Sequence, residues 1–171
     1  MTLRLPSAWT AIGVVAVGAV IAGAVVAGVR THDLSSKNDR LEHSLSSFEQ
    51  SALATGRQYA LQFATYRYDS FAADVAKTEA HSVDPFLSQY RSLTAADGQL
   101  QPGIVKLKST SSAKLISAGI ASISQTSAVL DVFLDQTIVN TKGSTTYAQR
   151  ITMTMVRPHD RWLISRVQIF D

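Results

Sequence analysis

The sequence predicts an α+β protein in which a membrane helix precedes one compact domain of helices and an antiparallel sheet. Three observations support this. An uncharged apolar run extends from Trp9 to Val29, apolar residues then recur at helical spacing to about Leu93, and the pattern changes to the alternation of strands beyond the breakers Gly98 and Pro102–Gly103. The expected segments are a short head (1–8), a transmembrane helix (9–29), a helical stalk (30–52) and an α+β domain (53–171).

The run from Trp9 to Val29 has the length of a helix that crosses a bilayer. At about 1.5 Å per residue it reaches about 30 Å, the thickness of the hydrocarbon layer, and it exceeds the apolar stretch of a cleavable signal. We expect a retained single-span anchor in the cytoplasmic membrane; the alternative is a signal peptide cleaved after residues 22–24. Basic residues lie on both sides, so charge leaves the orientation open. A short head before a large domain favours an extracytoplasmic C-terminal domain.

Small residues in this span form pairs with four-residue spacing, which lets two helix backbones approach closely. The pairs are Ala19/Gly23 and Ala24/Gly28. They predict a helix-pairing surface, and with it a homo-oligomer as one candidate assembly. Because glycine and alanine are common in any membrane helix, a purely structural role is the alternative.

The composition argues against most catalytic chemistry. The chain has no cysteine, which excludes disulfides and thiolate chemistry. Its histidines, His32, His43, His81 and His159, lack the spacing of a metal site, and no phosphate-binding loop or serine nucleophile motif occurs. We therefore expect no enzyme activity, no metal and no cofactor. The net charge of +3 comes without a dense basic cluster among aromatics, so we expect no nucleic acid partner, only mild attraction to anionic lipid or an acidic partner.

About three helices are expected before the sheet. The sharpest helix signal is Asp84 followed by Pro85, because aspartate caps free amides and proline suits a first helical turn. Phe86, Tyr90 and Leu93 then align on one face.

Four strands follow, at about 110–123, 128–141, 144–157 and 161–170. A two-residue turn at Lys142–Gly143 would pair Leu134 with Ile151 on the core face and Asp135 with Arg150 on the other face. A loop at residues 158–160 would then place Leu163, Val167 and Ile169 on the core face. The result is an antiparallel meander packed on helices, an α+β domain.

The opposite face of this sheet is unusually apolar for a surface that meets only water. We predict an interaction surface there, formed by Val129, Phe133, Val156, Trp162, Ile164 and Phe170. The alternative is that the chain's own loops or stalk cover these side chains. Asp131 and Asp135 are the candidate general bases, if a cavity holds one of them, although a cross-strand ion pair is the simpler role.

Several segments together resemble one protein family. After the span and stalk come YALQFATYRY (59–68), Asp74, FLSQY (86–90), AVLDVFLDQTIVN (128–140) and RITMTMVRPHDRWLISRV (150–167). In order and spacing they resemble the membrane proteins associated with mammalian-cell-entry (Mce) lipid transport systems of actinobacteria. Where the family pattern has a glycine before the tryptophan, this chain has His159–Asp160.

The resemblance implies a domain like nuclear transport factor 2 and like periplasmic assembly factors of type IV secretion, that is, a cone-like domain with about three helices packed on a curved four-stranded antiparallel sheet. It implies an accessory or scaffold subunit of an Mce-type envelope lipid-transport system, held to membrane lipids by its anchor and acting through contacts with Mce proteins or their permease. Two alternatives remain open: a small-ligand-binding or isomerase-like cone domain, and a secretion-channel assembly scaffold. Such folds host unrelated activities, so the partner rests on the resemblance.

Overall fold

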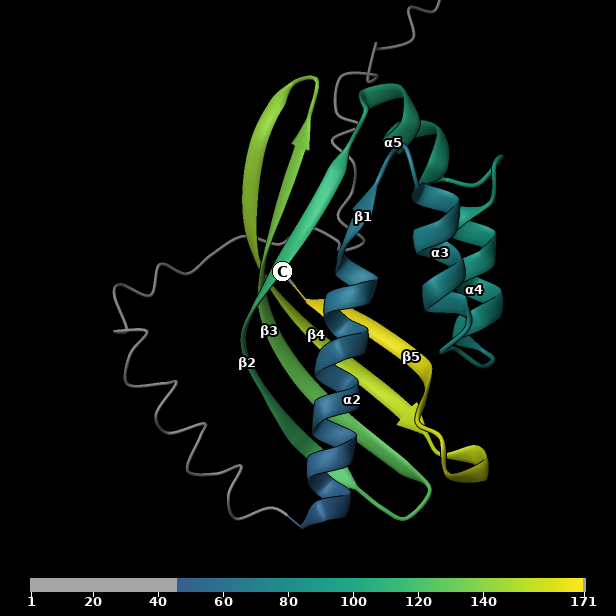
Figure 1. Cartoon of the computed structure of the whole chain (residues 1–171), viewed down its shortest axis with the longest axis vertical. Coiled ribbons are helices and arrows are strands. Elements are labelled where there is room, and N and C mark those ends of the chain that lie inside the picture. The colour runs from purple at the N-terminus through teal and green to yellow at the C-terminus, as the bar shows by residue number, and fades with distance from the viewer. Residues whose placement is uncertain (1–45, 171) are drawn as a thin grey trace, which may run out of the picture.

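The computed structural model describes residues 46–170, which form four helices and one five-stranded antiparallel sheet with strand order β1-β2-β3-β4-β5. Figure 1 shows the sheet curling around α2, with α3 and α4 side by side next to it. The predicted α+β cone is thereby confirmed. The elements are α2 (Ser47–Ala64), β1 (Tyr66–Arg67), α3 (Phe71–Glu79), α4 (Phe86–Thr94), α5 (Gln101–Leu107), β2 (Thr110–Ile123), β3 (Ser127–Asn140), β4 (Gly143–Val156), the 3-10 turn η1 (Pro158–Asp160) and β5 (Leu163–Phe170).

The predicted head, transmembrane helix and residues 30–45 of the stalk lie outside the described residues. The predicted pairing residues Ala19, Gly23, Ala24 and Gly28 lie there too. Within residues 46–170, no helix combines the length and apolar character needed to cross a membrane.

Helix α2 begins at a capping box. The side chain of Ser46 accepts a hydrogen bond from the Glu49 backbone N–H, and the Glu49 carboxylate accepts one from the Ser46 N–H at 2.8 Å. This reciprocal pair satisfies amides that an uncapped helix leaves free. Ala52 is fully buried and Phe48 packs against the core, so this end of α2 is part of the packed domain.

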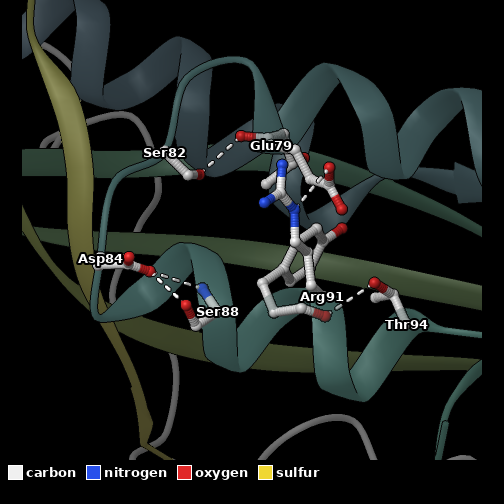
Figure 2. Close-up of polar contacts among 8 residues, drawn as sticks. Glu79, Ser82, Asp84, Ser88, Arg91 and Thr94 are labelled. Carbon is white, nitrogen blue, oxygen red and sulfur yellow. Dashed lines mark hydrogen bonds and ion pairs between the residues drawn. The ribbon is translucent and has the colours of Figure 1, made fainter.

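An ion pair joins helices α3 and α4, and a local cap lies at the start of α4 (Figure 2). Arg91 on α4 pairs with Glu79 on α3 at 3.1 Å. Asp84 accepts hydrogen bonds from the backbone N–H and the hydroxyl of Ser88, which confirms its predicted role at the start of this helix. Phe86 and Tyr90 turn inward and are buried, as their spacing predicts.

Helix α5 and strand β1 are absent from the sequence-based prediction. Pro102 and Gly103 were interpreted as breakers, yet Pro102 lies in the first turn of α5, where its missing N–H costs nothing. The helix ends at Lys108, which adopts a left-handed conformation with φ of 51°. Strand β1 is only two residues long and pairs with the start of β2, so it offers no periodicity to detect.

The β3–β4 register differs from the prediction by two residues. Asn140 pairs with Gly143, and the two-residue loop is Thr141–Lys142. The loop forms one residue early because the Asn140 side chain accepts a hydrogen bond from the Lys142 N–H at 2.8 Å, and Gly143 takes the positive φ of 136°. A shift of two keeps every side chain on its predicted face, so Leu134 is still in the core.

Strand β5 contains a β-bulge, and the residues before the bulge point to the opposite face of the sheet from the one that simple alternation predicts. Thr154 pairs with Arg166 but Met155 pairs with Ile164, which leaves Ser165 as the extra residue. Trp162 and Ile164 are consequently 4% and 1% exposed, in the core, and their predicted place on the outer face was wrong. Leu163 lies between these two residues along the chain and therefore faces outward, so its predicted place in the core is wrong. Val167 and Ile169 pack against the core as expected.

Candidate functional site

The outer face of the sheet carries an exposed aromatic pair with a cation between its members. Phe133 and Phe170 are 43% and 44% exposed. The guanidinium of Arg150 lies 5.9 Å from the centre of the Phe133 ring and 5.2 Å from that of Phe170. Since Phe133 pairs with Arg150, and Arg150 with Phe170, the three side chains cross three neighbouring strands. We call Phe133, Arg150 and Phe170 the outer aromatic patch.

Four of the six predicted interface residues remain on this face. Phe133 and Phe170 are exposed, and Val129 and Val156 are partly buried. Trp162 and Ile164 lie in the core instead of on this surface. The predicted surface is therefore smaller than the sequence indicates, and Arg150 is its central polar member.

The two candidate bases also lie on this outer face. Asp131 pairs with Arg150 at 3.2 Å and accepts a hydrogen bond from the Thr152 hydroxyl. The predicted ion pair between Asp135 and Arg150 is wrong, because the register places Arg150 opposite Phe133 and Asp135 opposite Ala148. Neither carboxylate lines the cavity inside the cone, so neither is placed to act as a base there.

That cavity, of about 220 Å³, lies between the concave face of the sheet and the helices α3 and α4. Most of its wall is apolar or aromatic, with Phe63, Phe71, Phe86, Leu93, Ile104, Ile138, Val167 and Ile169 among the lining residues. Among its polar lining residues are Gln136 on β3, Gln149 on β4 and Asp74 on α3.

The side-chain nitrogen of Gln136 already forms hydrogen bonds within the domain. Its Nε2 donates to the carbonyl oxygen of Ala64 at 2.9 Å and to the Ser111 hydroxyl at 2.8 Å. Ser111 itself donates to the same carbonyl at 2.7 Å. These bonds satisfy a carbonyl at the end of α2, which has no partner within its own helix. They also fix the amide orientation, because only the nitrogen can donate, and leave Oε1 as an acceptor without a partner among the described residues.

Gln149 is also buried, but its side chain has no comparable hydrogen bonds within residues 46–170. The residue is 5% exposed, lines the cavity, and forms no side-chain hydrogen bond within residues 46–170. It pairs with Leu134, and Gln136 is the next residue along β3 on the same face, so the two amides are diagonal neighbours. Its amide atoms are not among the side-chain atoms of residues 46–170 that are closed to solvent without a partner, so a molecule in the cavity can reach them.

The remaining polar groups of the cavity wall are either paired or held neutral. Burial alone would raise the pKa of Asp74, but hydrogen bonds from Lys77, the Arg67 N–H and Ser70 outweigh it, so the pKa lies below its ordinary value. Burial raises the pKa of Tyr66 to about 12 and also raises that of Tyr90. The cavity therefore offers an approaching molecule no free charge from these groups.

The two histidines within residues 46–170, His81 and His159, form no metal site. Nδ1 of His81 lies 2.9 Å from the Lys77 carbonyl oxygen, and burial followed by the nearby Arg161 lowers the pKa of this imidazole. His159 lies in the turn η1 with φ of 50°, and Asp160 follows with φ of 61°, both in the region that favours glycine. Within residues 46–170, no group of three or more histidine or acidic residues could hold a metal ion.

Neither the protein-family models nor the curated proteins include a match to this chain. Solved structures do match. The periplasmic domain of DotI has a TM-score of 0.62 at 15% identity, covering 74% of this chain and 97% of that one. An IcmL-like type IV secretion system protein from Legionella pneumophila has a TM-score of 0.60 at 9% identity, covering 70% and 90%. VirB8 from Agrobacterium tumefaciens has a TM-score of 0.57 at 12% identity, covering 68% and 87%.

These likenesses define the class of fold. The described part of the chain shares the fold of the DotI periplasmic domain, the IcmL-like type IV secretion system protein and VirB8, so the predicted likeness in fold to type IV secretion components is confirmed. At such low identity they show the fold alone. The signal that sequence reasoning missed is the pair Gln136 and Gln149, polar residues at inward positions of two strands whose other inward residues are mostly apolar.

Proposed function

We propose that this protein is a non-catalytic assembly subunit of a multi-subunit transport complex in the cell envelope. The helix at residues 9–29 would anchor it in the cytoplasmic membrane, with the domain on the extracytoplasmic side. The observation that carries the proposal is the outer aromatic patch, exposed on a domain whose fold is that of type IV secretion components.

The outer aromatic patch has the chemistry of a protein interface. Aromatic residues and arginine are enriched at interface centres, and the aromatic rings bury a large area while losing little conformational freedom. Arg150 is held in place by Asp131 at 3.2 Å and lies close to both phenylalanine rings. A partner would therefore meet a surface that is already ordered, which lowers the entropic cost of binding.

The positions of the carboxylates support a role without catalysis. Asp131 and Asp135 lie on the outer face, and Asp74, the carboxylate in the cavity wall, already accepts three hydrogen bonds. An isomerase-like reaction would need a free base inside the cone. None of these three aspartates meets that requirement.

The kind of complex is the finer part of the proposal. The structural neighbours favour a secretion-type assembly scaffold, since DotI, VirB8 and the IcmL-like protein share the fold. An Mce-type lipid-transport complex rests on the sequence resemblance alone. Both machines would use the same topology of a single anchor and an extracytoplasmic domain.

Affinity purification of the full chain from detergent-solubilised membranes of its own organism, followed by mass spectrometry, tests the proposal. Enrichment of channel subunits would support the secretion scaffold, and enrichment of Mce proteins or their permease would support the lipid-transport subunit. Recovery of the chain alone, under conditions that preserve other envelope complexes, would contradict both.

A further inference from the structure

We propose that the cavity behind α3 and α4 binds a small, neutral, largely apolar molecule through one hydrogen-bonding group, recognised by Gln136 and Gln149. This site is separate from the outer aromatic patch, because the cavity opens on the concave face of the sheet and the patch lies on the convex face. The inference does not depend on the proposed assembly role.

The two amides provide the recognition. Gln136 has its nitrogen committed to Ala64 and Ser111, so it offers only the acceptor Oε1. Gln149 is 5% exposed and has no side-chain hydrogen-bond partner in the described part of the chain. Its amide therefore offers both a donor and an acceptor. A hydroxyl, which donates once and accepts, matches this pair: it would donate to Gln136 and accept from Gln149.

The wall sets the charge and size of the ligand. Its one carboxylate, Asp74, is already bonded to Lys77, Ser70 and the Arg67 backbone, so neither a cation nor an anion would find a free counter-charge there. A cavity of about 150 Å³ accepts benzene, so one of about 220 Å³ has room for roughly seven to ten non-hydrogen atoms. A short-chain alcohol, or the hydroxylated end of a longer lipid, fits both limits.

The test uses the full chain in lipid nanodiscs with isotope-labelled isoleucine methyl groups, titrated with 1-hexanol. Ile104, Ile138 and Ile169 line the cavity and report binding there. Ile116 on β2 is 40% exposed, lies outside the cavity wall and serves as the internal control. Saturable shifts confined to the three cavity isoleucines are expected, and 1-methoxyhexane, which cannot donate to Gln136, should bind more weakly.

The variant Gln149→Leu separates recognition from mere filling of an apolar space. It should weaken hexanol binding about tenfold. The matched control Gln168→Leu, on the exposed outer face of β5, should leave binding unchanged. The probe partitions into the lipid equally in both samples.

Three outcomes would overturn the inference: no saturable shift with the unaltered chain, equal shifts at Ile116, or equal affinity in Gln149→Leu. If either variant fails to fold, the comparison of hexanol with 1-methoxyhexane on the unaltered chain still tests the hydrogen bond to Gln136. Equal affinity for the two probes would show that this bond does not form and would also overturn the inference.

Discussion

The hydroxyl of Tyr59 on α2 donates a hydrogen bond of 3.0 Å to the backbone carbonyl of Trp162, just before β5. These residues are more than a hundred positions apart and both are buried. The bond ties the long helix to the last strand, at the point where the bulge in β5 directs the indole inward. The indole packs beside Phe48, with ring centres 5.5 Å apart, and under the guanidinium of Arg157.

We expect Trp162→Ala to lower the free energy of unfolding by about 3–5 kcal/mol, because it removes a buried aromatic side chain and leaves a cavity. Urea denaturation followed by circular dichroism measures this change. Trp162→Phe keeps a ring against Phe48 and should cost less than half as much. A loss below about 1 kcal/mol for the alanine variant would show that this indole is not a core residue.

Gly56 lies on the buried face of α2, against side chains of the sheet. A Cβ built there would lie 2.5 Å from Cδ2 of Leu130, which is itself fully buried. We expect Gly56→Ala to destabilise the domain by about 1–3 kcal/mol, although alanine is the better helix former. Gly103→Ala in α5 meets nothing within 4 Å and should be neutral or stabilising. Thermal unfolding of the two variants compares them, and equal effects would refute close packing at Gly56.

Asp74 makes the stability depend on pH in a defined direction. Its carboxylate joins α3 to β1 through the Arg67 N–H, and its pKa in the folded state is lower than in the unfolded chain. This contribution is complete above the unfolded value of about 3.8 and is lost as the pH falls through the lower folded value. We therefore expect Asp74→Asn to cost about 1 kcal/mol near pH 7 and less below pH 3. Denaturation at several pH values measures this, and a cost that grows on acidification would contradict it.

The outer aromatic patch should contribute to assembly and little to folding. We expect the double variant Phe133→Ala and Phe170→Ala to keep its melting temperature within a few degrees, because both rings are more than two-fifths exposed. Its recovery with partner subunits should fall at least tenfold. Tyr68→Ala removes another exposed aromatic side chain outside this face and is the matched control. Unchanged recovery of the double variant would remove the patch from the interface.

Much of the fold was predictable because the strands carry their own pattern. The strands predicted at 110–123, 128–141 and 144–157 agree within one residue with the observed bounds of β2, β3 and β4. The core residues of β3 and β4 follow from the alternation of apolar and polar residues. Register and face were less predictable. The hydrogen bond of the Asn140 side chain determines which residues form the β3–β4 loop. The bulge at Ser165, for which the sequence carries no signal, places Trp162 and Ile164 on the inner face.

The cavity could not be predicted, because it depends on how α3 and α4 sit above the sheet. The two glutamines at inward positions were visible in the sequence, but only the fold shows that Gln136 has a structural partner and that Gln149 has none within the described residues. The ion pair of Arg150 depended on the register in the same way, since a shift of two residues exchanged Asp135 for Asp131.

The central claim, that the outer face of the sheet docks onto another envelope subunit, is tested most directly by cross-linking in intact membranes. A photoreactive amino acid at position 133, in the full chain, would lie on the exposed part of this face. The account predicts a discrete cross-link to a membrane or envelope subunit, absent when the same group is placed at position 68. Failure to form any specific adduct from position 133, or equal adducts from both positions, would contradict it.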